Sequence, residues 1–441
     1  MSKEISLSKL FFPIYFAMMT SLFISIANTY MVSLIDPYLV GAMGAGNQVM
    51  MLFGTVFNML AVGCSVVVSQ AIGAKDERLS VGAIHVSISF NFIIGLVCGL
   101  FVFFNAFILL KLLQIPDAVF SQSLSYLKIL SIALIFDALA IVLVAVIRAY
   151  GYANYSMMAS IIIAVVTISC NYLVLFEPFG LPNLGLNGVA AANVVGRIIG
   201  VFVLLFILIK VIGIHLRIAK FLKIRIYILK KILSIGLPSA GENLIWVFQY
   251  MVAFAFVASM GEGSLTVQTI YFQISAFIFF ASSAIGISNE VIVARLVGKG
   301  DNTAAYKQTF RNLAIGIVIT CGFLLVVYIG KFCIMDVLNL DETLQSIMLP
   351  LFTLSIFLES ARTLNVVMVN ALRASGDAKF PFYMGIIFML GVSIPIGYFL
   401  GIVMKIGIIG VWIGFFADEF LRGLANTFRW KSKKWQDKKL V

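Results

Sequence analysis

The sequence predicts an all-α integral membrane protein with twelve transmembrane helices in two six-helix lobes related by a pseudo-twofold axis. Three observations support this prediction. Apolar residues make up 62% of the 441-residue chain and charged residues only 11%, whereas charged residues make up about 25% of a typical soluble domain. Apolar stretches of the roughly 20 residues needed to cross a bilayer as a helix recur along the whole chain. Landmarks of the first half also recur in the second half at a constant offset.

This internal repeat has an offset of 225 residues, by which Pro13 in LFFPIYF corresponds to Pro238 in SIGLPSA. A register shared by several positions indicates a duplicated structural unit. We therefore expect an N-terminal lobe at 1–212, a basic cytoplasmic linker at 213–232, and a C-terminal lobe with a basic tail at 233–441. The same offset relates four further residues, Gly73, Asp76, Arg148 and Gly151, to Gly298, Asp301, Arg373 and Gly376.

Six predicted membrane spans fall in each lobe. Backbone N–H and C=O groups cannot be hydrated in hydrocarbon, so each span is expected to be a helix. Because each lobe holds an even number of spans, both lobes enter the membrane in the same orientation. The spans are 10–35, 46–71, 83–110, 119–147, 155–177 and 186–212, then 233–260, 265–294, 309–335, 344–372, 380–402 and 406–428.

The turns between spans contain residues suited to helix ends. Gly73, Gly298 and Gly300 separate apolar runs from charged residues, so we expect them to end the preceding helices with positive φ. Asp76 and Asp301 are expected to cap the helices that follow. These motifs are interpreted as structural.

Basic residues predict the orientation of the chain, whose net charge is +12. One set of loops contains only Lys111, Lys331 and Lys405, whereas most other basic residues lie in the opposite loops, the linker and the tail from Arg429 to Lys439. Because basic residues are retained on the cytoplasmic side, both termini are expected in the cytoplasm. Topology and anionic lipid headgroups explain the charge without a nucleic-acid partner. We expect a monomeric, multi-pass protein of the cell membrane.

The order and duplication of these landmarks resemble those of the MATE family of multidrug and toxic-compound extrusion transporters. The resemblance rests on the early proline of each lobe, the GAKD and GKGD turns, RAxG after the fourth span, and GxxGV opening the sixth. It implies a secondary active antiporter that exports amphipathic, often cationic compounds by alternating access, in exchange for H⁺ or Na⁺. The 39 Phe and 18 Met residues can provide adaptable walls for such compounds.

Ionisable residues inside membrane spans are costly and mark functional sites. Glu242 is the first candidate for binding the coupling cation, including Na⁺, because it lies one turn after Pro238. A proline frees backbone carbonyl groups that can join a carboxylate as ligands. The resemblance implies an acid in this helix, although many relatives carry it eight residues after the proline, at Trp246 here. We assign Trp246 to the substrate cavity.

Glu359 is a second candidate for cation coupling, and the resemblance implies an acid near this level. Arg362 lies three residues later, so a local ion pair explains both residues equally well. Asp137 is a third candidate, with an ion pair to Lys128 or Arg197 as the alternative. Asp137 and Arg362 are related by the repeat offset, so equivalent sites carry opposite charges. We expect Arg362 to face the substrate cavity.

Two asparagines are also assigned to the substrate cavity. Asn28 in IANTYM stands where many relatives carry Asp, and an amide cannot carry a proton, so Asp137 would substitute in any proton relay. Asn171 in ISCNYLV matches an Asn common in relatives. An interhelical hydrogen bond is the alternative role for Asn171.

Other classes of function fit the sequence less well. The five cysteines lack CxxC spacing and there are only two histidines, so we expect no metal centre and no cofactor besides the coupling ion. No Walker motif is present, and no enzyme activity is expected. A flippase for lipid-linked oligosaccharide would need several cationic cavity residues. A channel or membrane receptor is the alternative from a different class, although a pore would show rings of selectivity residues.

Overall fold

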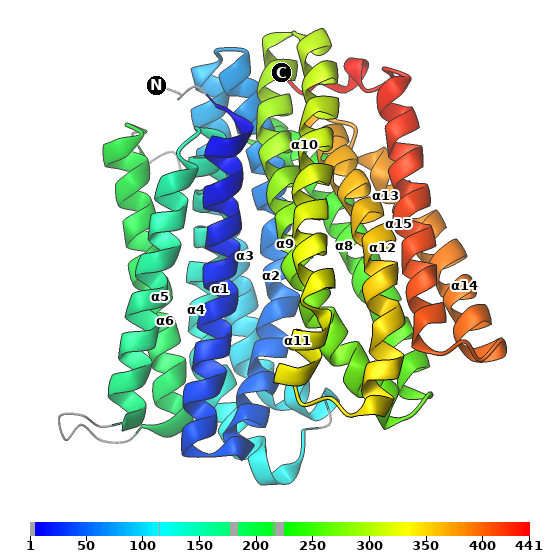
Figure 1. Ribbon diagram of the computed structural model, residues 1–441. Coiled ribbons are helices and arrows are strands. Elements are labelled where there is room, and N and C mark those ends of the chain that lie inside the picture. Colours follow the sequence, from blue (N-terminus) through cyan, green and yellow to red (C-terminus); the bar gives the residue numbers. More distant parts are fainter. Residues whose placement is uncertain (1–4, 114, 177–183, 215, 217–224) are drawn as a thin grey trace. The chain divides into compact units, whose positions relative to one another are not determined.

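The computed structural model describes residues 5–113, 115–176, 184–214, 216 and 225–441, and within these ranges every regular element is a helix (Figure 1). Eleven of the helices so described are long and apolar enough to cross a membrane. The predicted all-α membrane fold is confirmed. Residues 215 and 217–224 of the predicted linker lie outside the described ranges.

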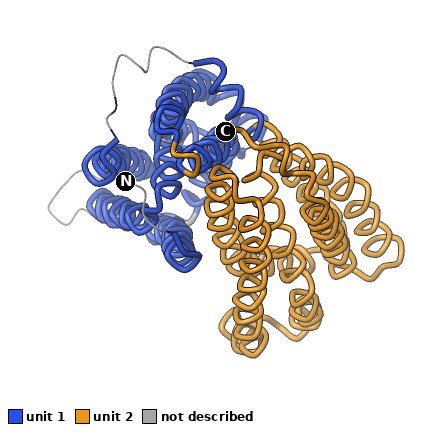
Figure 2. The backbone as a smooth tube through the Cα atoms, turned by 90° about the horizontal axis from the view of Figure 1, so that it is seen from above, with its two compact units in different colours: residues 1–72, 76–236 blue, residues 73–75, 237–441 orange. Residues whose placement is uncertain are grey.

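The chain divides into two compact units, residues 1–72 with 76–236, and residues 73–75 with 237–441 (Figure 2). In the first unit α6 continues as a π-helical turn, Ile207–Val211. The helices of this unit are α1 (Leu7–Ile35), α2 (Pro37–Gly73), α3 (Glu77–Leu112), α4 (Asp117–Ala149), α5 (Ala153–Phe176) and α6 (Gly185–Phe206).

The second unit begins within α8. The first eleven residues of this helix are assigned to the first unit, and the rest of it belongs to the second. A short 3₁₀ turn, Gln436–Lys438, follows the last helix. The helices are α8 (Ile226–Ala258), α9 (Glu262–Lys299), α10 (Asn302–Ile329), α11 (Lys331–Val337), α12 (Glu342–Ser375), α13 (Lys379–Gly385), α14 (Ile394–Tyr398) and α15 (Ile408–Lys431).

Three pairs of equivalent helices pack alike in the two units. In the first unit α3 packs on α4, α4 on α6, and α5 on α6; in the second, α10 packs on α12, α12 on α15, and α14 on α15. The turns also correspond, because Gly151 and Gly376, related by the repeat offset, have φ of 86° and 102°. Both values lie in the left-handed region that favours glycine. The packing is therefore that of a duplicated unit.

The twelfth predicted span, 406–428, corresponds to α15 (Ile408–Lys431). This helix is not among the eleven apolar spans. The difference has a clear cause: Asp418, Glu419 and Arg422 lie inside it, and all three are buried. The charges pack within the second unit, so a helix of low hydropathy is still part of the bundle.

The predicted span 380–402 is a single continuous helix from Lys379 to Val403 with irregular winding. Two stretches, Ile386–Ser393 and Phe399–Val403, have the wider turns of a π-helix. Pro395 lies between them and has no backbone N–H, and π turns accommodate such interruptions. Gly414 of α15 packs closely on this helix, because a Cβ atom there would lie 2.5 Å from the carbonyl oxygen of Ser393.

The predicted aspartate caps are confirmed. The carboxylate of Asp76 accepts a hydrogen bond from the N–H of Leu79 at 2.9 Å. Asp301 accepts one from Ala304 at the same distance. Each satisfies a backbone donor in the first turn of the helix that follows.

The predicted glycine caps are confirmed only in part. Gly300 ends α9 with φ of 84°. The prediction is wrong for Gly298, which lies inside α9, and for Gly73, since Lys75 takes the left-handed conformation after α2. Gly73 instead allows close packing, because a Cβ atom there would overlap the carbonyl oxygen of Arg295.

Candidate functional site

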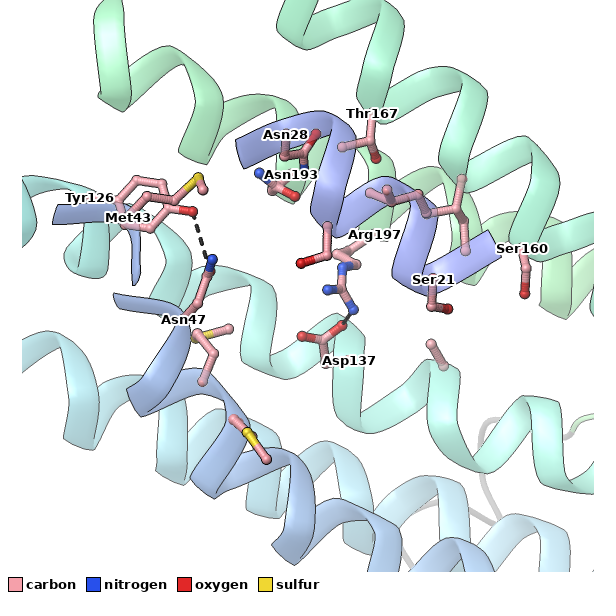
Figure 3. Close-up of a pocket in the computed structure, with 16 residues that line it drawn as sticks. Ser21, Asn28, Met43, Asn47, Tyr126, Asp137, Ser160, Thr167, Asn193 and Arg197 are labelled. Carbon is pink, nitrogen blue, oxygen red and sulfur yellow. Dashed lines mark hydrogen bonds and ion pairs between the residues drawn. The ribbon is translucent and has the colours of Figure 1, made fainter. Parts of the chain in front are cut away.

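The first unit contains a cavity of about 400 Å³, lined by residues of α1, α2, α4, α5 and α6 (Figure 3). Methionine and isoleucine side chains form the apolar part of its wall. The polar part consists mainly of amides and hydroxyls, including those of Ser21, Asn28, Asn47, Ser160 and Asn193. A cavity of mixed polarity and this size suits a small amphipathic molecule.

The charged residues in this cavity are Asp137 on α4 and Arg197 on α6. Nη1 of Arg197 donates to Oδ1 of Asp137, so the pair joins two helices across the cavity wall (Figure 3). Of the two partners predicted for Asp137, the structure therefore selects Arg197. The arginine side chain is 45% exposed and the aspartate 14%. The two charges compensate each other, and the guanidinium is the more accessible group.

Asn28 and Asn171 are linked across α1 and α5. Nδ2 of Asn171 donates to Oδ1 of Asn28 at 2.7 Å. Asn28 lines the cavity, whereas Asn171 is buried behind it and is not part of the lining. Of the two roles predicted for Asn171, the interhelical hydrogen bond is the one observed.

Glu242 on α8 is buried in the second unit between two arginines. Its Oε2 lies 2.8 Å from Nη2 of Arg373 on α12, and its Oε1 lies 3.5 Å from Nη1 of Arg422 on α15. Arg373 lies in the last turn of α12, and its guanidinium thus pairs with an acid on another helix. One carboxylate holds together three helices that are far apart in the chain.

Arg422 is the branching point of this group of charges. It meets Asp418, one helical turn earlier, through two contacts of 2.6 and 2.8 Å. It also lies 3.3 Å from Glu419. Nε2 of Gln249 on α8 donates to Asp418 at 3.3 Å. The charged face of α15 is thus directed at α8 and α12.

Glu359 and Arg362 form the other end of the group. They are 2.7 Å apart on α12, as expected for residues three positions apart, and Arg362 also lies 3.5 Å from Glu419. The hydroxyl of Ser275 on α9 donates to Oε1 of Glu359 at 2.6 Å. Glu359 has no exposed surface.

Seven charged side chains of the second unit therefore form one connected group, which we call the carboxylate–arginine network. If all seven are ionised, four negative and three positive charges leave a net charge of −1. Oε2 of Glu359 is buried without a hydrogen-bond partner among the described residues. A buried, unsatisfied carboxylate oxygen is costly unless a proton or cation neutralises it. The members are Glu242, Glu359, Arg362, Arg373, Asp418, Glu419 and Arg422.

The predicted site residues thus separate into two places. Glu242, Glu359 and Arg362 meet in the carboxylate–arginine network, whereas Asp137 and Asn28 lie at the cavity of the first unit. Trp246 on α8 is not part of that cavity lining and stacks on Tyr250, with ring centroids 5.9 Å apart.

Three network members on α15, Asp418, Glu419 and Arg422, are not among the predicted site residues. The signal for them is the run DEFLR inside a long apolar stretch, because charges three and four positions apart share a helix face. No group of three or more His, Cys, Asp or Glu side chains within the described ranges is arranged to hold a metal ion.

A family model described as MatE matches this chain twice, over residues 13–173 and 238–399. The matches begin at Pro13 and Pro238, the first pair of landmarks in the internal repeat. Two independent matches to one model therefore reproduce the 225-residue offset.

Several curated proteins are similar over most of their length. The uncharacterized transporter YisQ of Bacillus subtilis is 33% identical over 441 residues, covering 99% of this chain and 96% of YisQ. The probable multidrug resistance protein YoeA of the same organism is 24% identical, with 84% and 82% covered. The probable multidrug resistance protein NorM of Thermotoga maritima is 21% identical, with 90% and 86% covered.

Solved structures share the fold. A crystal structure of MATE in the bent conformation superposes with a TM-score of 0.89 at 16% identity, covering 97% of this chain and 94% of that one. An outward-facing multidrug resistance transporter of the MATE family gives 0.88 at 16% identity, covering 97% and 95%.

Proposed function

Because the chain belongs to the MatE family of multidrug efflux transporters, we propose that it is a secondary active antiporter. It exports amphipathic small molecules in exchange for H⁺ or Na⁺. The two lobes, 1–212 and 233–441, move so that the binding site opens to one side of the membrane at a time. The chemistry is therefore the exchange of bound species, without a covalent step.

The site of ion coupling is assigned to the carboxylate–arginine network. The observation that carries this assignment is the excess of one carboxylate, together with the unpartnered Oε2 of Glu359. One proton or one monovalent cation would bring the network to neutrality. Glu242 and Glu359 are the coupling residues, since Glu242 is the acid that joins α8 to both α12 and α15 and Glu359 carries the unpartnered oxygen. Asp137 ranks below them, because Arg197 already compensates its charge.

A cation bound in this network can change the preferred conformation only if its affinity differs between states. The ion pairs of Glu242 provide such a difference. A state that separates α8 from α12 or α15 would leave Glu242 without Arg373 or Arg422, and an incoming cation would replace the lost arginine. Release of that cation would favour the state in which the pairs form again.

The substrate is assigned to the cavity of the first lobe. Asn28 contacts it directly, and Asn171 holds the Asn28 amide in position by their hydrogen bond. The distribution of basic residues supports a multi-pass protein of the cell membrane with both termini in the cytoplasm, and we propose that it acts as a monomer.

Reconstituted vesicles with an imposed proton or sodium gradient test this function. Two fluorescent amphipaths serve as substrates: dansylcadaverine is a cation and Nε-dansyl-lysine is a zwitterion. The test therefore does not depend on which of these charges the transporter accepts. The wild type should move at least one of them in a saturable, gradient-driven exchange. Conduction without saturation or exchange would contradict antiport.

The variants Glu242→Gln and Glu359→Gln should lose gradient-driven transport while remaining inserted and folded. Glu262→Gln is the matched control, because Glu262 is an exposed acid on α9 outside the network. The control should transport like the wild type. Wild-type transport by both network variants would move the assignment to Asp137.

A further inference from the structure

The residues that line the cavity of the first unit carry no excess of negative charge. Among the residues lining it, Asp137 and Arg197 are the ionisable acid and base, and they are paired. Asn28 of α1 adds an amide to this lining and no charge. A lone cation entering this cavity would lose its hydration without meeting an uncompensated negative charge.

The guanidinium of Arg197 is the charged group best placed to meet a ligand. It is 45% exposed, about three times the exposure of Asp137. Only Nη1 takes part in the ion pair, and the other guanidinium N–H groups have no hydrogen-bond partner among the described residues. In Figure 3 the guanidinium lies in the open centre of the lining residues, between Asp137 and Asn193. Its free edge is directed at the space a ligand would fill.

The neighbouring side chains favour a ligand with an apolar body. Met43, Met50 and Met51 line the α2 side of the cavity, and Ile24 and Ile163 line the sides formed by α1 and α5. Methionine side chains adapt to varied aromatic shapes. The volume of about 400 Å³ is also large enough for more than a single small ion.

We propose that this cavity binds amphipathic compounds that carry a carboxylate, as anions or zwitterions, with Arg197 holding the carboxylate and the methionines holding the apolar body. The proposal rests on the assignment of this cavity to the substrate. A planar guanidinium offers two parallel N–H groups to a carboxylate, which makes it the side chain best matched to that group. In a zwitterion, the ammonium group can reach Oδ2 of Asp137, the oxygen outside the ion pair.

Equilibrium binding to the purified, detergent-solubilised full-length protein tests the proposal independently of transport. Four probes share one fluorescent body and differ in charge: dansylglycine is an anion, Nε-dansyl-lysine a zwitterion, dansylcadaverine a cation and dansylamide neutral. The wild type should bind dansylglycine and dansyl-lysine about tenfold or more tighter than dansylcadaverine and dansylamide, as expected for charge-assisted hydrogen bonds. Equal or tighter binding of the cation overturns the proposal.

Three variants separate the role of Arg197 from a general loss of structure. Arg197→Gln should lower the anion-to-cation affinity ratio by about tenfold to a hundredfold, because it removes the carboxylate ligand and leaves Asp137 uncompensated. Asp137→Asn should keep the affinity for dansylglycine and remove any advantage of dansyl-lysine over it. An unchanged affinity ratio in Arg197→Gln contradicts the proposal, since a merely structural role would affect all four probes alike.

Lys128→Gln is the matched control. Lys128 is an exposed cation on α4, the helix of Asp137, and it does not line the cavity. If loss of this charge changes the affinity ratio as much as Arg197→Gln does, the effect is long-range electrostatics and the proposed carboxylate contact is wrong.

Vesicles that transport none of the probes, while binding keeps the predicted order, would contradict the antiporter function and leave this proposal standing.

Discussion

Glu242 and Arg373 form an ion pair of 2.8 Å between α8 and α12, although they are 131 residues apart in the chain. The repeat makes this pair specific to the second unit. The counterpart of Arg373 is Arg148, which donates to the hydroxyl of Ser156 at 3.4 Å. The counterpart of Glu242 is Ala17, which has no charge to offer. Both units thus retain the arginine. Only in the second unit does the chain also place an acid, Glu242, at the position that pairs with it.

Breaking this pair should destabilise the second unit. Arg373→Gln leaves Glu242 with Arg422 alone, and we expect a loss of about 3 kcal/mol in the free energy of unfolding, the lower end for a buried ion pair. Combining it with Glu242→Gln should cost less than the two single losses together, because neither charge is then unpaired. Thermal unfolding of the purified variants measures this, with the exposed Lys379→Gln as the control. Strictly additive losses would mean that the two side chains do not interact.

Cysteine labelling in intact cells should report the orientation of the chain. In a background without the five native cysteines, Tyr38→Cys and Glu262→Cys should react with an impermeant maleimide. Lys75→Cys and Lys434→Cys should react only after permeabilisation. All four positions are exposed, so access is decided by the side of the membrane. Labelling of the second pair in intact cells excludes the inside–inside topology.

The close packing of α15 on the helix from Lys379 to Val403 should make Gly414 intolerant of a side chain. The Cβ atom of Gly414→Ala would lie 2.5 Å from the carbonyl oxygen of Ser393, so the backbone must move. We expect a loss of about 1–3 kcal/mol in unfolding free energy, measured by thermal unfolding. Gly391→Ala, on the helix that faces α15, is the control, because its Cβ atom meets nothing within 4 Å. Equal effects of both changes would show that this contact is not tight.

Replacing Asn28 by Asp should alter selectivity without disturbing the fold. An aspartate retains an oxygen that can accept the hydrogen bond from Asn171, so the melting temperature should stay close to that of the wild type. The new charge would leave the cavity with two acids and one base. Dansylcadaverine should then bind about tenfold tighter than to the wild type, as for a charge-assisted contact. A tighter affinity for dansylglycine instead would contradict the charge balance inferred for this cavity.

Much of the fold is predictable from the sequence, because hydropathy and repetition are local or periodic signals. The shared offset of Pro13 and Pro238 predicts the duplicated unit, and the capping roles of Asp76 and Asp301 follow from their place between apolar runs and charged turns. The low hydropathy of α15 is also visible in the sequence, where it indicates partners within the protein.

The contacts of the candidate site are less predictable. Glu242 and Arg422 are 180 residues apart, and Asn28 and Asn171 are 143 residues apart. Which side chains meet depends on how each helix is rotated about its axis. A helix that is apolar on all sides gives little information about this rotation, because its hydrophobic residues do not define one buried face. The sequence therefore identifies the costly residues but leaves several of their partners open.

The charges buried in α15 also bear on how the chain enters the bilayer during synthesis. Asp or Arg at the centre of an isolated inserting helix costs about 2.5–3.5 kcal/mol, and α15 carries Asp418, Glu419 and Arg422. The contact between Asp418 and Arg422 within one turn offsets part of this cost. The remaining partners lie on α8 and α12, both of which leave the ribosome earlier. Biogenesis of this lobe is therefore ordered: the last helix becomes stable in the membrane once the helices that neutralise it are already there.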